Sequence, residues 1–425
     1  MIADRMLDRR AYLIIELRLT KKLKIRLAKM QLMLMAASVT LCAPGGSVAA
    51  DEAEEQSVAV SKFSYGSRGL QFDDGSGNNY LWFGVRLQTR WSSSHVSQDA
   101  LPDDPVSSNS EFKLNRGRLK LGGHLVSPDF TVYSEYDFID DRLLDLRATY
   151  AFTDWLSIRA GQWKSQYNRE RTDSSGAQQF VERSVVTPWF TLDRQKAVML
   201  SGRIGKGSRL DTSYWTGLLS GAGRGGSLSD ADGLWMTRLQ WNITGEVLAF
   251  SQSALQRFKA GRGSIAIAAV TGHSRYTSFS SAGGGQLPGF DEGESDQYYL
   301  RQWLFETAWQ KGGFSWQQEL HWKAIDDQVS GEKRRLFGGY AQAGMFFAEL
   351  FRSFPQPLEL AARYARVDPN DNLASDVEKE ATLVANWFFN DHRNKLSLDV
   401  SRVIRRLAPE TKTDNRIRLQ WDWSF

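Results

Sequence analysis

The C-terminal stretch Asp-Asn-Arg-Ile-Arg-Leu-Gln-Trp-Asp-Trp-Ser-Phe, residues 414–425, alternates between apolar and polar side chains. In an extended chain the apolar face carries Ile417, Leu419, Trp421, Trp423 and Phe425, and the opposite face carries Arg416, Arg418, Gln420, Asp422 and Ser424. A strand in lipid can satisfy its backbone only by pairing within a closed barrel, so this pattern predicts an outer-membrane barrel with a wet interior. The alternative is an edge strand of a soluble β-sandwich.

The N-terminus has the residue order of a secretory signal. Five basic residues between Lys21 and Lys29 precede an apolar stretch from Met30 to Ala43, and Ser47-Val-Ala-Ala50 follows it. We expect residues 1–50 to be a signal peptide, with Met30 or another internal Met as an alternative start. Residues 51–79 are then a periplasmic N-terminal segment. The apolar stretch is shorter than the ~18 residues that a membrane-spanning helix needs.

The charge balance changes when this leader is set aside. The chain has 53 basic and 49 acidic residues, but residues 1–50 hold 9 basic and 3 acidic ones, which leaves 44 basic and 46 acidic residues. Nucleic-acid binding therefore loses its compositional support, and any attraction of anions must come from where charges lie in a pore. Cys42 is the only cysteine and lies in the leader, so no disulfide is expected.

Residues 80–425 divide into sixteen extended segments, which predict an outer-membrane β-barrel. These segments are 80–91, 112–124, 130–138, 145–152, 156–164, 196–204, 209–217, 233–243, 264–276, 297–310, 313–323, 335–348, 357–367, 379–389, 395–406 and 414–425. Long links at 92–111, 165–195, 218–232 and 277–296 alternate with tight turns at 127–129, 153–155, 205–208 and 311–312. Long outer loops and short periplasmic turns are typical of bacterial barrels, and sixteen strands leave room for an aqueous channel.

One segment tests this count. Residues 247–258 have the composition of another strand, but an odd number would place the link 277–296 on the short-turn side. We therefore interpret residues 244–263 as an enlarged periplasmic turn with a helical piece at 252–259.

Six basic residues are the candidates for the pore lining, because they alternate with lipid-facing apolar residues in their strands. They are Arg86, Arg90, Arg116, Arg118, Lys120 and Arg159. Four more arginines fall on lumen faces by the same test: Arg238, Arg363, Arg416 and Arg418. A charge at the bilayer midplane costs about 2 to 4 kcal/mol on the lipid face, which favours this orientation. Such a wall has two interpretations: fixed cations that give a pore its anion preference, or arginines paired with lumen carboxylates to stiffen the wall. Candidate partners are Glu135, Asp137, Asp399 and Asp422.

The link 165–195 follows the fifth strand and is too long for a plain hairpin. Links of about thirty residues in a compact fold are usually functional, and we expect this one to fold into the barrel and narrow it. Its basic candidates are Lys164, Arg169, Arg171 and Arg183. The alternative is a surface loop whose charges are solvated.

Enzyme and adhesin functions are the alternatives to a channel. The five histidines are His95, His124, His273, His321 and His392, and no nucleophile motif or metal-ligand spacing accompanies them. We expect no catalytic residue, metal or cofactor. The alternative from a different functional class is a non-conducting adhesin or enzyme barrel. An open lumen would favour a channel over this alternative.

Several stretches, in order, resemble the phosphate-selective porin O/P family from about residue 80 to the end. They are Asn115-Arg-Gly-Arg-Leu-Lys-Leu-Gly-Gly123, Gly161-Gln-Trp-Lys164, Arg169-Glu-Arg171, Glu182-Arg-Ser184, Leu358-Glu-Leu-Ala-Ala-Arg-Tyr-Ala-Arg366, Ala385-Asn-Trp-Phe-Phe-Asn390 and Arg416-Ile-Arg-Leu-Gln420. This resemblance implies a homotrimeric, sixteen-stranded channel with a basic constriction, and in the type members uptake of phosphate. Where many members have Pro-Phe-Gly, this chain has Ser165-Gln-Tyr-Asn168.

The expected function is a passive, water-filled porin in the outer membrane of a Gram-negative bacterium, with a bias toward small anions such as phosphate. A general, weakly selective porin on the same scaffold is the alternative. Expected partners are anionic solutes, outer-membrane lipid and the barrel-assembly machinery, which reads a terminal aromatic such as Phe425. Replacing Arg116 and Arg118 by alanine is expected to lower the anion preference.

Overall fold

The computed structural model describes residues 61–98, 107–227, 232–280, 282–371, 373, 376–407 and 410–425. The predicted signal peptide, residues 1–50, lies outside these ranges, as do residues 51–60 of the predicted periplasmic segment, and both stay predictions.

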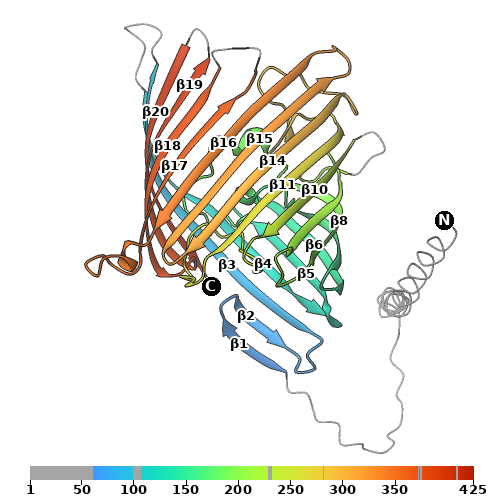
Figure 1. Cartoon of the computed structure of the whole chain (residues 1–425), viewed down its shortest axis with the longest axis vertical. Helices are drawn as coiled ribbons and strands as arrows, with labels where there is room; N and C mark the ends of the chain where they lie inside the picture. Colours follow the sequence, from blue (N-terminus) through green and yellow to red (C-terminus); the bar gives the residue numbers. More distant parts are fainter. Residues whose placement is uncertain are drawn as a thin grey trace, which may run out of the picture. The chain divides into compact units, whose positions relative to one another are not determined.

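Sixteen antiparallel strands form the barrel wall, one for each predicted segment (Figure 1). They are β3 (Tyr80–Gln98), β4 (Ser107–Leu125), β5 (Ser127–Asp137), β6 (Arg142–Thr153), β7 (Leu156–Lys164), β8 (Arg194–Ile204), β9 (Thr212–Leu219), β10 (Gly233–Asn242), β11 (Arg262–Ser274), β14 (Tyr298–Lys311), β15 (Phe314–Asp327), β16 (Lys333–Met345), β17 (Leu358–Asp368), β18 (Glu378–Asn390), β19 (Asn394–Leu407) and β20 (Glu410–Ser424). β3 and β4 are longer than predicted, with 19 residues each.

The barrel closes where β20 meets β3. These two strands pair from Lys412↔Gln98 to Ser424↔Arg86. The N–H of Phe425 then donates to the Val85 carbonyl at 3.0 Å, and its own carbonyl accepts from the Val85 N–H at 2.7 Å. Closure leaves the wall without an unpaired edge, which is what a β-structure in lipid requires.

The two faces of the wall differ as the sequence predicts. On β20, Arg418, Gln420 and Asp422 are buried, whereas Trp421 and Trp423 are exposed. Because the exposed side chains are apolar along most strands, the outside suits lipid and the polar face lines the lumen. Arg86, Arg90 and Arg118 are buried on this inner face.

A hairpin that the sequence did not predict precedes the barrel. β1 (Lys62–Gly66) pairs with β2 (Gly69–Asp73), and β2 pairs with β3 from Asp73↔Tyr80 to Leu70↔Phe83. It therefore extends the sheet beyond the C-terminus of the chain (Figure 1). Gly69 has a φ of +100°, and a Cβ there would lie 2.1 Å from the Phe83 carbonyl oxygen, so only glycine fits.

Two links differ from expectation. Residues 244–261 contain no strand, as predicted, but the helical piece expected at 252–259 is wrong, because these residues form turns. The link 244–261 bonds to lumen-facing side chains instead. For example, Gln310 Nε2 donates to the Ser251 carbonyl at 3.0 Å. The outer link 277–296 contains an unpredicted hairpin of β12 (Ser278–Ser280) and β13 (Gly283–Gly285).

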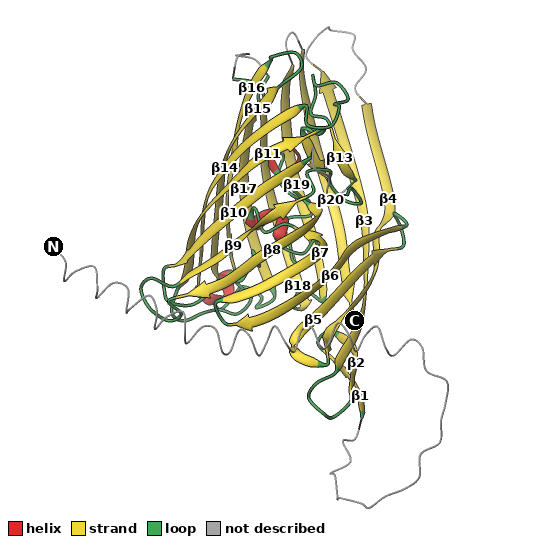
Figure 2. Ribbon diagram, turned by 90° about the vertical axis from the view of Figure 1, so that its right-hand side faces the viewer, coloured by secondary structure: helices red, strands yellow, loops and turns green. Residues whose placement is uncertain are grey.

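Helices are few and short. α2 (Arg169–Thr172) and α3 (Thr187–Phe190) lie in the link between β7 and β8, inside the ring of strands (Figure 2), and the 3-10 turn η1 (Phe347–Glu349) follows β16. Among the described residues, none of the helices has the length and apolar content of a membrane span.

Candidate functional site

Residues 165–193, here called the crossing segment, are fixed to lumen-facing side chains on the wall opposite β7. Asn168 Nδ2 donates to Glu319 Oε2 of β15 at 2.9 Å, and the Glu170 N–H donates to the other Glu319 oxygen at 2.7 Å. Farther along, the Val185 N–H donates to Glu380 of β18 at 2.8 Å. The segment therefore passes through the lumen and does not lie on the outer surface.

The start of the crossing segment carries a buried ion cluster. Arg169 Nε and Arg238 Nη2 both lie close to Glu306 Oε1, at 2.9 and 2.8 Å. Arg238 Nη1 also donates to the second oxygen of Glu306, at 2.9 Å. All three side chains are buried, and a buried charge is tolerable only when it is paired in this way.

Glu170 folds the crossing segment back on itself. Its carboxylate accepts from the N–H and the hydroxyl of Ser184, both at 2.8 Å, and from the hydroxyl of Thr187. Arg363 of β17 lies 3.5 Å away. Burial raises the pKa of Glu170, and the positive charge of Arg363 acts against this rise.

The turn of the crossing segment at Gln178 and Gln179 meets the enlarged periplasmic turn. Gln179 Nε2 donates to Glu359 Oε1 at 2.8 Å, while its N–H donates to Gln252 Oε1 at 2.8 Å. Lys395 Nζ donates to the Gln178 carbonyl at 2.6 Å. These bonds fix the crossing segment to the wall and to the enlarged periplasmic turn.

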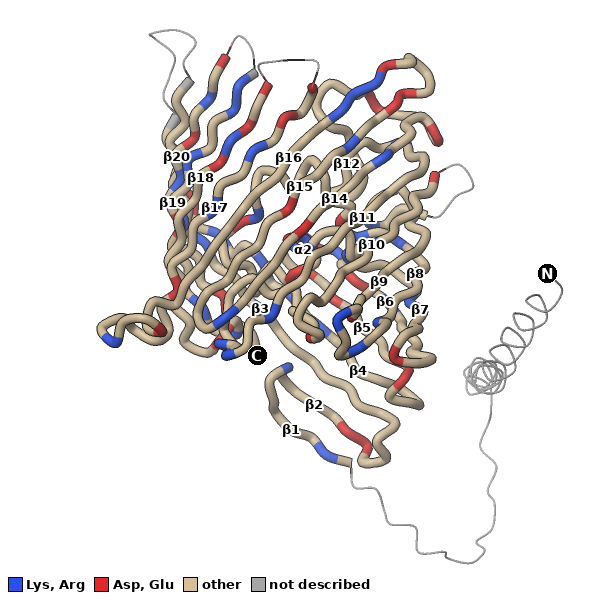
Figure 3. The backbone as a smooth tube through the Cα atoms, viewed as in Figure 1, with Lys and Arg blue, Asp and Glu red and all other residues tan. Residues whose placement is uncertain are grey.

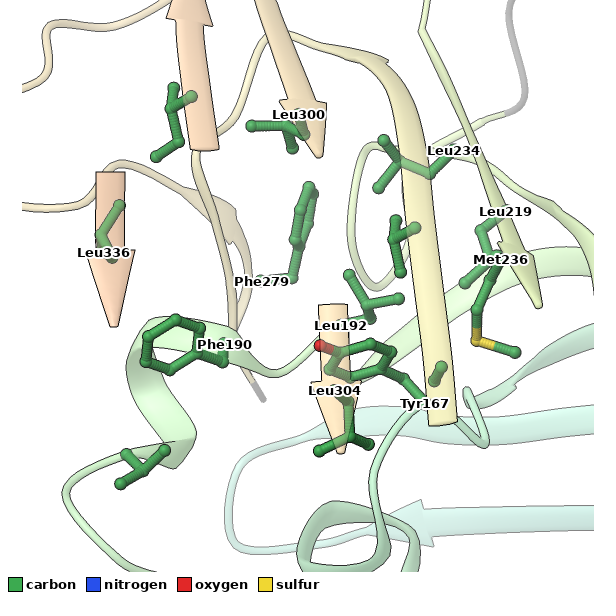
Figure 4. Packing of buried hydrophobic residues seen from close by; sticks show 14 of the residues in the cluster. Tyr167, Phe190, Leu192, Leu219, Leu234, Met236, Phe279, Leu300, Leu304 and Leu336 are labelled. Carbon is green, nitrogen blue, oxygen red and sulfur yellow. The ribbon is translucent and has the colours of Figure 1, made fainter. Parts of the chain in front are cut away.

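An apolar cluster fills the lumen beside the same wall, toward the outer end of the barrel. Tyr167, Phe190 and Leu192 of the crossing segment pack with Phe279 of β12 and with inward side chains of the wall (Figure 4). The wall residues are Leu219, Leu234, Met236, Leu300, Leu304 and Leu336. Apolar side chains therefore exclude water from this half of the barrel.

The opposite side of the crossing segment borders a small cavity of about 160 Å³, here called the basic pocket. Its charged lining consists of seven basic residues and one acidic residue: Arg116, Arg118, Arg142, Lys164, Arg171, Arg183, Arg194 and Asp140. A bulge in β4, where Asn115 has no partner between Gln88↔Arg116 and Thr89↔Leu114, brings Asn115 and Arg116 together on this lining. Bulges commonly re-aim side chains beside functional sites.

Carboxylates neutralise only part of this charge. Arg118 lies 2.7 Å from Asp137 and 2.8 Å from Glu135, and Arg194 lies 2.5 Å from Asp145. Arg171 is paired with Asp193. These contacts match the structural interpretation of the lumen arginines, as do Arg86 with Asp422 and Arg418 with Asp399, each at 2.8 Å.

Lys164 and Arg183 have carbonyl partners instead of carboxylates. Lys164 Nζ donates to the Asp173 carbonyl at 2.9 Å, and Arg183 donates to the carbonyls of Glu170 at 3.0 Å and Asp173 at 2.9 Å. Within the described part of the chain, neither cation has a carboxylate oxygen within 4.0 Å. Arg116 has only Glu182, at 3.8 Å, which it shares with Arg90 at 2.6 Å. Lys164, Arg183 and Arg116 are therefore the basic residues of the pocket with the weakest contacts to carboxylates.

A wider cavity of about 400 Å³, the outer cavity, lies on the other side of Arg183. Its charged lining is mixed: Glu182, Arg183, Glu378, Glu380, Arg405, Arg416 and Arg418. Leu287 and Pro288 of the outer link also border it, so it lies toward the outer end of the barrel. Arg183 is the lining residue that the outer cavity and the basic pocket share.

The structure brings together five of the ten basic candidates and leaves five elsewhere. Arg116, Arg118, Lys164, Arg171 and Arg183 line the basic pocket. Arg86 and Arg90 lie on the neighbouring wall of β3, and Lys120 pairs in register with Glu135. Arg159 Nε donates to Thr149 Oγ1 at 3.0 Å, and Arg169 faces the far wall.

Two pocket residues were missing from the predicted set. Arg142 begins β6, three residues before the predicted start of that strand, so its face could not be assigned. Arg194 begins β8, and its position at the end of a basic link was a usable signal.

Comparison with known proteins assigns the chain to a family. The model of the family described as phosphate-selective porin O and P matches residues 83–423. No curated protein matches the chain in sequence.

Solved structures share the fold at low sequence identity. A loop-deletion mutant of OmpT, an outer membrane protein of Vibrio cholerae, has a TM-score of 0.52 at 9% identity, over 81% of this chain and 99% of that one. The anion-selective porin from Comamonas acidovorans has a TM-score of 0.50 at 10% identity, over 81% and 99%. The outer membrane channel DcaP of Acinetobacter baumannii has a TM-score of 0.50 at 10% identity, over 81% and 97%. The chain belongs to the phosphate-selective porin O and P family of outer-membrane β-barrels.

Proposed function

We propose that this porin is a passive channel that favours small anions, phosphate among them. The observation that carries the proposal is the basic pocket, where Lys164 and Arg183 have carbonyl partners only and Arg116 has one distant carboxylate. Fixed cations at a narrow point raise the local anion concentration. Their influence extends only about 8 Å at physiological salt, so the residues at the pocket set the preference.

The size and donor chemistry of the pocket also support an oxyanion. Guanidinium groups form paired, charge-assisted hydrogen bonds with oxygens of phosphates and carboxylates. About 160 Å³ is room for one small ion with little water around it. A solute would move down its own gradient, since nothing in this proposal supplies energy.

The experiment is a planar-bilayer recording of the purified protein under a KCl gradient, repeated with millimolar phosphate. Anion-selective current that phosphate reduces supports the proposal. The Arg116→Ala/Arg118→Ala variant is expected to shift the reversal potential toward zero. Unchanged reversal potentials in that variant would reject these two residues as part of the filter.

A general, weakly selective porin is the second candidate, and a specific observation favours it. The ion pairs of Arg86, Arg118, Arg171, Arg194 and Arg418 neutralise much of the lumen charge. Large current that phosphate leaves unchanged would support this candidate. No current at all would support a non-conducting adhesin or enzyme barrel.

We also propose a homotrimer, assembled through the wall at β5, β6 and β7. These strands are short, with 11, 12 and 9 residues, and the outside of this wall exposes Phe138, Ile139 and Leu146. A subunit contact there would bury these apolar side chains. The mass of the protein in detergent tests the proposal.

A further inference from the structure

The outward face of β16 to β18 has a floor of small side chains. Ala341 and Ala343 of β16, Ala362 of β17, and Ala381 and Ala385 of β18 lie between taller neighbours such as Tyr364 and Leu383. This floor forms two grooves of about 800 and 540 Å³, which share Ala343, Ala362, Leu383 and Val400 and so form one trough. A void against these side chains forfeits their dispersion contacts, so the trough favours an occupant.

The trough lies within the lipid-facing band and is apolar. Its exposed apolar neighbours include Leu360, Leu398 and Ile417. Because outward residues at this depth face hydrocarbon, the occupant there must be hydrocarbon or an apolar protein surface.

Three cations stand at the outer end of the trough. Arg366 of β17 is directly opposite Lys379 of β18, and Lys379 is opposite Ile404. Arg402 of β19 lies two residues from Ile404, is exposed and lines the trough. Arg366, Lys379 and Arg402 lie an even number of residues from the outward Tyr364, Leu383 and Val400 of their strands, so they share the lipid side of the wall. Figure 3 shows basic segments toward the upper ends of these strands.

These cations have little compensation from the described residues. Arg366 has Asp368 at 3.9 Å, and no ion pair joins Lys379 or Arg402 to a described carboxylate. Like charges directly opposite each other on adjacent strands are destabilising. An anionic group held between them would relieve this repulsion, and phosphate oxygens suit both arginine and lysine.

We propose that this face binds a phosphorylated, acylated lipid of the outer leaflet. Its phosphate lies among Arg366, Lys379 and Arg402, and an acyl chain fills the trough. A second copy that used the same face would bring no carboxylate to the three cations, because no Asp or Glu lines the trough.

Native mass spectrometry of the purified porin in detergent tests the proposal, with diphosphoryl lipid A and phosphatidylcholine as probes. The Arg366→Gln/Lys379→Gln/Arg402→Gln variant is expected to bind lipid A at least tenfold more weakly and phosphatidylcholine unchanged. Arg301→Gln removes an outward cation of β14 that does not line the trough, and is expected to change neither affinity by more than twofold. Wild-type affinity of the triple variant for lipid A would overturn the proposal.

A filling variant tests the trough separately. Ala362→Trp/Ala381→Trp is expected to weaken the binding of lipid A severalfold while leaving the three cations in place, and unchanged binding would refute the acyl-chain site. Ala381→Cys, labelled with a benzophenone, identifies the occupant directly in native membranes. A crosslink to a phosphate-bearing lipid supports the proposal, whereas a crosslink to a second copy of the chain overturns it.

Discussion

The two sides of the crossing segment face opposite surroundings. On one side, Tyr167 and Phe190 lie in an apolar cluster, and the nearby guanidinium groups of Arg169 and Arg238 share the carboxylate of Glu306. On the other side, Lys164 and Arg183 have only backbone carbonyls as partners. One half of the lumen is therefore filled like a protein core, and the other half holds the basic pocket.

This difference has a physical reason. A buried cation without a counter-ion costs several kcal/mol. In the filled half Arg169 and Arg238 therefore lie against Glu306, while Lys323 donates to two backbone carbonyls. Lys164 and Arg183 border the basic pocket, so an anion that enters it can serve as their counter-ion. Stability and ion preference should thus depend on different residues.

The largest effect is expected from Glu306→Ala. The change leaves Arg169 and Arg238 without their shared carboxylate, and breaking a buried ion pair in this way costs about 3 to 5 kcal/mol. We expect a lower midpoint of urea unfolding in detergent. Glu111→Ala is the control, because Glu111 forms an exposed pair with Lys113 at 2.9 Å, and such pairs contribute about 0 to 1 kcal/mol. Equal midpoints for the two variants would show that the filled half does not depend on its charge pairing.

A smaller effect is expected from Lys164→Gln/Arg183→Gln, and on ion preference instead of stability. In water, a unit charge about 5 Å from an anion contributes about 0.8 kcal/mol, or about fourfold in local concentration. Screening by salt reduces the combined interaction energy of the two charges with the anion. We therefore expect the chloride-to-potassium permeability ratio to fall about tenfold. Reversal potentials in a KCl gradient measure this ratio.

Arg159→Gln is the matched control for that variant. Arg159 also lies on the lumen face, but it is bonded to Thr149 and does not line the basic pocket. Its replacement should change the permeability ratio less than twofold. A loss as large as that of the double variant would mean that the total lumen charge sets the preference, and not the pocket.

The barrel itself could be predicted from the sequence because its signal is local. Each strand alternates between a lipid and a lumen face, as Leu419, Gln420 and Trp421 do, so sixteen segments and their faces follow from short windows. The β1–β2 hairpin was missed although its residues also alternate, because each of its strands has only five residues.

The interior could not be predicted because its contacts are long-range. Arg169 and Glu306 are separated by 137 residues, and Gln179 and Glu359 by 180. No periodicity relates such partners, so the sequence could identify basic residues of the crossing segment but not which of them would be neutralised. Arg169 and Arg183 look equivalent in the sequence, yet they lie on opposite sides of the segment.

The smallest effect is expected from the titration of Asp173, beside the basic pocket. Burial raises the pKa of Asp173 to about 6, although Lys164 and Arg183 act in the opposite direction. Between pH 7.5 and pH 5 this carboxyl therefore gains a proton and loses its negative charge. Burial also acts to raise the pKa of Glu182, but Arg90 and Arg116 outweigh it and hold that pKa well below its usual range, so Glu182 stays charged.

Acidification should consequently make the pocket more positive by one charge and raise the chloride preference by less than about fourfold. Asp173→Asn should show the acid value of the permeability ratio at both pH values, because the asparagine carries no charge. Reversal potentials in KCl, without phosphate, keep the titration of the solute out of the measurement. If the variant retains the wild-type pH dependence, another group is responsible for the titration. Asp173 would then have only a structural role, through the hydrogen bond that its carboxylate accepts from the Ser174 N–H at 2.8 Å.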